Sequence, residues 1–243
     1  MRKRYCIYIF SILFAALLFA AAEAAAAVVS IPANKDNTMY SENGALSNGA
    51  GDNFFAGTTN TSAARRALIS FPLTSLPSCV VIQGVTLTLN MSRTISGGET
   101  VTLHRILADW GEGTSNATLQ EGKGAAATPG DATWTFSFFN TIAWAAAGGS
   151  FSPTVSASQS VSGVGFYSWS SAQMIADVQG WANGSLPNHG WILVGNEGAA
   201  ATAKRFDSRT NPTVGNRPVL QITFFDCTPV ESVTWGKIKS MYR

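Results

Sequence analysis

The chain has few of the side chains that carry out acid–base or metal chemistry. Charged residues make up 12% of its 243 residues, and it has two histidines, His104 and His189. Neither lies near a Gly-x-Ser-x-Gly or cysteine partner, and His-Glu-x-x-His is missing. Asp109 and Glu112 are close in sequence, but glycosidases need two facing carboxylates, so we interpret this pair as fixing a loop. A polysaccharide-degrading enzyme is therefore only the second alternative.

The body of the chain also lacks an excess of positive charge. The formal net charge is +2, yet between Val28 and Asp226 there are ten basic and twelve acidic residues. A nucleic-acid binder normally needs a basic surface that releases counterions from phosphates. The composition therefore disfavours nucleic acid as a partner.

Cysteine is scarce, which limits covalent cross-links to one. Of the three cysteines, Cys6 lies near the start, and Cys79 and Cys227 remain in the body. In an oxidising compartment these two can form one disulfide, which would stabilise the fold by about 3–5 kcal/mol in the chain-entropy model. The alternative is two separately buried thiols, and no zinc or redox spacing is present.

The first 27 residues have the features of a signal peptide. Arg2, Lys3 and Arg4 precede an uncharged apolar stretch, which an alanine-rich segment follows. A retained anchor would need a longer apolar run and a positive flank. We therefore expect a cleaved leader at 1–27, a secreted or cell-surface protein, and no membrane span after cleavage.

Residues 28–227 consist mostly of short strand patterns separated by Gly, Asn, Ser and Pro. Val85–Met91 and Glu99–Arg105 alternate between apolar and polar residues on either side of a Ser-Gly-Gly turn, which predicts a hairpin. Further strands are expected at Thr38–Ser41, Asn53–Ala56, Ala67–Phe71, Phe166–Trp169, Trp191–Val194, Lys204–Asp207 and Arg217–Phe225. This pattern predicts an all-β fold, a single jelly-roll-like β-sandwich.

Three segments depart from the strand pattern. Met174, Ile175, Val178 and Trp181 have helical spacing after Ser170 and Ser171, which can cap a helix, and Gly184 should end it. Residues 125–162 are expected to form a long loop packed down by its aromatic side chains. The basic segment 228–243 is interpreted as either a flexible end or an attachment or sorting tag.

Aromatic and basic side chains provide the candidate ligand-binding residues. The tryptophans in or beside predicted loops, on which sugar rings can stack, are Trp110, Trp134, Trp144 and Trp169. The basic candidates are Arg66, Lys204 and Arg209, because guanidinium groups bind carboxylates bidentately. By contrast, Arg65, Arg205 and Arg217 are interpreted as pairing with nearby acids. These residues favour an extracellular polysaccharide as the partner, including acidic ones.

A structural calcium ion is an open alternative near the start of the body. Asp36, Glu42 and Asp52 are neighbours of several asparagines, and oxygen ligands of this kind suit a hard cation. The same residue types are equally expected in turns without a metal. No other cofactor is expected.

Several short motifs occur in a specific order along the body. They are Asp36-Asn-Thr-Met-Tyr-Ser-Glu42, Arg65-Arg-Ala-Leu-Ile-Ser-Phe-Pro-Leu73, Asp109-Trp-Gly-Glu112, Lys204-Arg-Phe-Asp-Ser208 and Arg217-Pro-Val-Leu-Gln-Ile222. In this order the chain resembles the DNRLRE-domain family of exported bacterial and archaeal proteins. The resemblance implies a jelly-roll-like sandwich, usually non-catalytic, and some members recognise alginate-like polymers through lysines and arginines on one face.

Together these observations predict a secreted, non-catalytic carbohydrate-binding module that is a monomer. The first alternative is a structural or adhesive protein of a cell surface or matrix. An exposed row of aromatic and basic side chains on one face would favour the binding module, and a surface covered by Ser, Thr and Asn would favour the structural protein.

Overall fold

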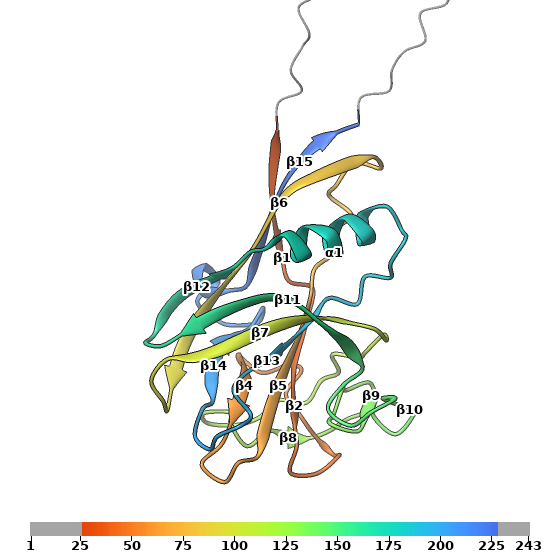
Figure 1. Cartoon of the computed structure of the whole chain (residues 1–243). Helices are drawn as coiled ribbons and strands as arrows, with labels where there is room; N and C mark the ends of the chain where they lie inside the picture. Colours follow the sequence, from red (N-terminus) through yellow and green to blue (C-terminus); the bar gives the residue numbers. More distant parts are fainter. Residues whose placement is uncertain (1–25, 228–243) are drawn as a thin grey trace, which may run out of the picture.

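The computed structural model describes residues 26–227, which form mainly antiparallel strands and one α-helix (Figure 1). The longer strands are β1 (Ala27–Pro32), β2 (Lys35–Tyr40), β4 (Asn53–Thr58), β5 (Ala64–Ser70), β6 (Val80–Thr94), β7 (Glu99–Ile106), β11 (Phe151–Val161), β12 (Gly165–Trp169), β13 (Trp191–Val194), β14 (Lys204–Asp207) and β15 (Val219–Asp226). The short elements are β3 (Leu46–Ser47), β8 (Ala125–Ala126), β9 (Phe136–Phe138), β10 (Ile142–Ala143), α1 (Ala172–Ala182) and the 3₁₀ turn η1 (Val214–Asn216). The predicted all-β class is confirmed, and the jelly roll stays a prediction. Most of the predicted leader, and the 228–243 segment, lie outside the described residues.

The long strands form one antiparallel sheet that curls so that its two halves face each other. One half has the order β1-β15-β6-β14-β4, with β12 beside β6; the other has β5-β13-β7-β11, with β2 beside β5. A short β4–β5 pairing joins the halves. One cluster of buried side chains contains Leu87 and Phe206 from the first half and Ile69 and Leu103 from the second. The fold is therefore sandwich-like, with its core between the two halves.

Strand β6 illustrates why these sequences form strands with one buried face. Its apolar residues at every second position, Val85, Leu87, Leu89 and Met91, are all buried, and the polar residues between them are only half-buried. Successive side chains of a strand point to opposite faces, so this alternation places all the apolar ones on the core side.

The predicted hairpin between Val85–Met91 and Glu99–Arg105 is wrong. Strand β6 pairs with β12, β14 and β15, whereas β7 pairs with β11 and β13. The segment after Thr94 therefore crosses from one half of the sheet to the other. Each strand has one apolar face, and packing these faces against each other across the core buries both of them.

The expected long loop at 125–162 is also partly wrong, because it contains β11. This strand pairs with β7 along most of its length and buries Ala157 and Val161. Its serines and threonines are small and polar, so its sequence, FSPTVSASQSV, lacks the strong apolar alternation of β6. The pairing with β7 determines its conformation.

The helix forms where the sequence predicts it. Ser171 caps its first turn, because the side-chain Oγ accepts a hydrogen bond from the Met174 N–H at 2.9 Å. Gly184, with a φ of +72°, follows its C-terminal end. Met174, Val178 and Trp181 extend the core. At 11 residues α1 is too short to span a bilayer, and no other helix in 26–227 is long and apolar enough to do so.

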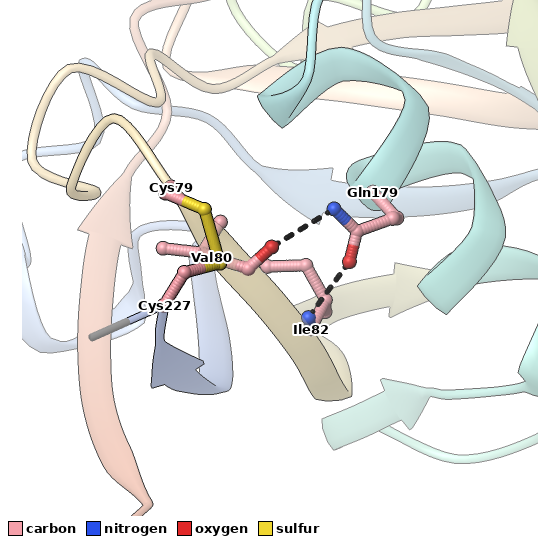
Figure 2. The surroundings of a disulfide bond; sticks show 5 residues. All are labelled: Cys79, Val80, Ile82, Gln179 and Cys227. Carbon is pink, nitrogen blue, oxygen red and sulfur yellow. Dashed lines mark hydrogen bonds between the residues drawn. A yellow bond between two sulfur atoms is a disulfide. The ribbon is translucent and has the colours of Figure 1, made fainter. Parts of the chain in front are cut away.

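The predicted disulfide is confirmed and joins β6 to the end of β15. Cys79 and Cys227 are 148 residues apart in sequence, with their Cα atoms 5.2 Å apart. Figure 2 shows that Gln179 of α1 lies beside this link. Its side-chain amide donates to the Val80 carbonyl at 3.1 Å and accepts from the Ile82 N–H at 2.9 Å. The chain ends described here leave the sheet at this same end (Figure 1).

Candidate functional site

Three of the four tryptophans predicted to stack on sugar belong to the interior. Trp110, Trp144 and Trp169 are 1%, 6% and 0% exposed. Each indole N–H donates to a backbone carbonyl, at 2.8, 2.8 and 2.9 Å respectively. For these three the prediction is wrong, because buried rings with satisfied N–H groups present no face to a ligand.

Trp134 and Arg66 contact each other. Trp134 is half-buried, and the Arg66 guanidinium lies 4.8 Å from the centre of its ring. Arg66 also forms two hydrogen bonds with the Glu197 carboxylate, at 2.7 and 2.8 Å, and one with the Gly148 carbonyl at 2.8 Å. These contacts occupy the guanidinium, so the predicted role of Arg66 in holding a ligand carboxylate is not supported.

Lys204 and Arg209 are likewise engaged within the protein. The Lys204 side chain is fully buried, and its ammonium donates to Thr94 Oγ1 at 2.7 Å and to the Gly97 carbonyl at 2.5 Å. Burial lowers the pKa of Lys204. Arg209 forms an ion pair with Glu112. The buried Lys204 therefore holds a loop in place and presents no charge to a ligand, which corrects its prediction, whereas the ligand-binding role of the partly exposed Arg209 stays a prediction.

The three predicted calcium ligands are not assembled into a metal site. Glu42 pairs with Arg65, and Asp36 Oδ2 accepts the Arg209 N–H at 2.6 Å. Burial raises the pKa of Asp36 to about 7. Across the part of the chain that the structure describes, no group of three or more His, Cys, Asp or Glu residues could hold a metal ion. The backbone N–H of Arg209 therefore occupies an oxygen of Asp36, and the Arg65 guanidinium occupies Glu42. Asp52 belongs to no cluster of metal-binding residues in the described part of the chain.

A groove of about 380 Å³ lies where β4, β14 and the end of β6 run side by side. Its lining residues are Phe55, Thr59, Asn60, Thr61, Arg65, Arg93, Thr94, Ile95, Gln120, Gly122, Ala203 and Arg205. The strand register pairs Arg205 with Phe55 on one side and with Arg93 on the other. Directly paired residues share a face of the sheet, so these three side chains form a row across the groove.

In the part of the chain that the structure describes, the two arginines of this row share a neutral hydrogen-bond acceptor and have no carboxylate partner. Arg93 Nη1 and Arg205 Nη1 both donate to the side-chain oxygen of Gln120, at 2.6 and 2.8 Å. Within residues 26–227 neither of them forms an ion pair. Burial lowers the pKa of Arg205; Asp207 opposes this effect and Arg93 adds to it. Two positive charges thus lie side by side with only a neutral acceptor between them.

Glu121, the acid next to Gln120, opposes through its charge the lowering of the Arg205 pKa by burial, but it forms no hydrogen bond with either arginine within residues 26–227. Glu121 directs its carboxylate to the N–H groups of Asp52 and Asn53, at 3.1 and 2.8 Å, and to Asn48 Nδ2 at 2.9 Å. Arg65 also lines the groove, but Glu42 neutralises it. Among the described residues that line the groove, Arg93 and Arg205 are therefore the charged side chains without a directly bonded acid.

Apolar and small polar groups complete the groove. Of the two large apolar side chains that line it, Phe55 is largely buried and Ile95 is 48% exposed. Thr59, Asn60 and Thr61 follow β4 and contribute exposed or half-exposed hydroxyl and amide groups. This combination suits a sugar ring, which has an apolar C–H face and a rim of hydroxyls.

A second, smaller pocket of about 190 Å³ lies between β11 and α1. It contains the buried carboxylate of Asp177, which accepts from Ser156 Oγ at 2.5 Å, Trp191 Nε1 at 3.0 Å and Gln173 Nε2 at 3.1 Å. Arg105 lies 3.8 Å away. With its oxygens occupied by these donors, Asp177 joins α1 to the sheet and is not a free catalytic acid.

Sequence reasoning missed the residues that define the groove. Arg93 was not among the candidates, and Arg205 was interpreted as pairing with an acid. Arg93 follows the predicted end of its strand at Met91, whereas β6 continues to Thr94. The register that brings residue 93 to residue 205 joins strands distant in sequence, so no local pattern could have indicated it.

No protein-family model matches the chain, and no curated protein matches it. The resemblance to the DNRLRE-domain family therefore stays a prediction based on its short motifs.

Proposed function

We propose that this protein is an exported, non-catalytic carbohydrate-binding module that holds a carboxylate-bearing polysaccharide in the groove between β4, β14 and β6. The observation that carries the proposal is the side-by-side pair of Arg93 and Arg205, which lacks a carboxylate partner in the described structure. Like charges opposite each other on neighbouring strands destabilise a sheet. A bound anion would remove that repulsion and gain charge-assisted hydrogen bonds.

The other lining groups support a saccharide as the anion's carrier. The exposed apolar side chain of Ile95 suits the C–H face of a pyranose ring, and Asn60 and Thr61 can hydrogen-bond to hydroxyls. Among the described residues that line the groove there is no Asp, Glu or His. Binding therefore fits this surface better than hydrolysis, which needs an acid and a base or nucleophile.

The disulfide supports the proposed location outside the cytoplasm. A bond such as Cys79–Cys227 persists in oxidising compartments and is rare in the reducing cytosol. Export would bring the groove into contact with extracellular polysaccharides.

Affinity gel electrophoresis of residues 28–243 tests the proposal. A gel containing polygalacturonate should retard the protein, whereas a gel containing neutral dextran should not. Arg93→Gln and Arg205→Gln should each weaken retardation about tenfold or more, because each removes a charged donor. Arg217→Gln is the matched control, since Arg217 does not line the groove. Retardation by no polymer would contradict the proposal and favour the structural or adhesive alternative.

A further inference from the structure

The side chain of Gln120 lies at the centre of the arginine pair. Its oxygen, Oε1, accepts from Arg93 Nη1 at 2.6 Å and from Arg205 Nη1 at 2.8 Å. A single neutral oxygen thus receives hydrogen bonds from two guanidinium groups. A carboxylate would satisfy the same two donors better, since it brings two oxygens and a negative charge.

The backbone on either side of Gln120 is firmly held. Leu119 and Glu121 have φ angles of +60° and +61°, a left-handed conformation that costs roughly 1 kcal/mol or more for a non-glycine residue. Glu121 fixes the loop through its carboxylate contacts with Asn48, Asp52 and Asn53, and its carbonyl accepts from Tyr40 Oη at 2.9 Å. The position from which the Gln120 side chain extends is therefore set by its neighbours.

The Gln120 side chain itself is held much more loosely than its backbone. The residue is exposed, and in the described structure its side chain makes only the two hydrogen bonds from the arginines. Its amide nitrogen has no protein acceptor among residues 26–227. Rotation of the side chain away from the groove would therefore break two hydrogen bonds and leave the loop in place.

We infer that Gln120 is a displaceable stand-in for the ligand: its amide oxygen occupies the position of one oxygen of a sugar carboxylate, and an acidic saccharide binds by replacing it. This inference deepens the proposed function and rests on it. It makes Gln120 a residue that limits affinity and selects for anions, because a neutral sugar hydroxyl gains little by replacing an amide oxygen.

Two substitutions at this position separate displacement from direct contact. Gln120→Glu preserves size and supplies an internal carboxylate to both arginines, so affinity for polygalacturonate should fall about tenfold or more. Gln120→Ala removes the competing oxygen, so affinity should rise about three- to tenfold, the equivalent of one net hydrogen bond. Because the side chain is exposed, both variants should fold like the wild type, which their thermal unfolding checks.

Isothermal titration of the wild type, both Gln120 variants and Arg93→Gln with polygalacturonate oligomers distinguishes the possible failures. If the wild type and Arg93→Gln behave as proposed but Gln120→Ala binds more weakly, Gln120 contacts the ligand and the inference is overturned. Unchanged affinity in Gln120→Glu would also overturn it. If none of the four proteins binds, the proposed function itself fails. If Gln120→Ala is the one protein of the four that binds, the Gln120 side chain blocks the ligand in the wild type, which supports the inference.

Discussion

Strand β6 ends in two very different environments. It spans 15 residues, up to about 46 Å at roughly 3.3 Å per residue. At its start, the Cys79–Cys227 disulfide links the strand to the end of β15, and the Gln179 side chain of α1 hydrogen-bonds to its backbone (Figure 2). Near its far end, Lys204 holds the backbone that follows, but Arg93 faces a second arginine.

The difference separates groups that stabilise the fold from groups that remain available. Buried polar groups in proteins are almost always satisfied by partners, as are Lys204 and Asp177 here, and the half-buried Gln179 is satisfied as well. The arginine pair breaks a local rule of sheet pairing without an evident structural gain. Departures of this kind are expected at functional sites, and the following substitutions test whether the two ends of β6 differ in this way.

Removing the disulfide should have the largest effect on stability. The combined change Cys79→Ala and Cys227→Ala should lower the free energy of unfolding by about 3–5 kcal/mol, since the link constrains a very long loop of the unfolded chain. Binding of polygalacturonate should not change, because the groove lies at the other end of β6. Urea unfolding measures the loss; a reducing agent should reproduce it in the wild type and leave the variant unaffected. Equal stability of the two proteins would show that the link contributes little.

Removing the buried ammonium of Lys204, which holds the segment from Thr94 to Gly97 near the groove, should have the next largest effect. Lys204→Met keeps the length of the side chain but leaves Thr94 Oγ1 and the Gly97 carbonyl without their charged donor. Stability should fall by about 2–3 kcal/mol, and polysaccharide affinity should fall as well because Arg93 precedes this segment. Lys123→Met, at an exposed lysine, is the matched control and should change stability by less than about 0.5 kcal/mol. A Lys204 variant as stable as this control would show that the ammonium does not hold this segment.

A smaller effect is expected from the helix contact beside the disulfide. Gln179→Leu should cost about 1–2 kcal/mol, since the Val80 carbonyl and the Ile82 N–H lose their partner. Hydrogen exchange should accelerate at the Ile82 amide in particular. The same substitution at the exposed Gln221 should leave both stability and exchange unchanged. If the Ile82 amide stays as protected as in the wild type, Gln179 does not hold this end of β6.

Local sequence patterns predicted the elements well and their neighbours poorly. The structure agrees with three such predictions: the alternation in β6, the helix cap at Ser171 and the Cys79–Cys227 disulfide. The first two depend on nearby residues, and the third follows because the body has only two cysteines. The predicted hairpin was wrong because two amphipathic strands can bury their apolar faces in two ways: as hydrogen-bonded neighbours in one layer, or in two layers that face each other across the core. Periodicity alone does not distinguish these arrangements.

The candidate site was harder to predict for the same reason. Trp110 and Trp169 lie near loop sequences, which suggested exposure, yet each indole N–H finds a carbonyl inside the fold. Arg205 has acids nearby in sequence, but the strand register places it next to Arg93. The availability of a charged side chain depends on such long-range partners, so only the assembled sheet distinguishes Arg205 from Arg66.

The smallest change in stability is expected for Arg93→Gln, and it tests most directly whether the two ends of β6 differ. Arg93→Gln should change the free energy of unfolding by no more than about 0.5 kcal/mol, and in the stabilising direction, because the repulsion from Arg205 that it removes outweighs the hydrogen bond that Arg93 donates to the exposed Gln120. The gain should be measurable in low salt and should vanish in 1 M NaCl, where the screening length is about 3 Å. A loss of more than about 1.5 kcal/mol would mean that Arg93 stabilises the fold as Lys204 does. The arginine pair would then be one more structural clamp, and the case for an anion-binding groove would fall with it.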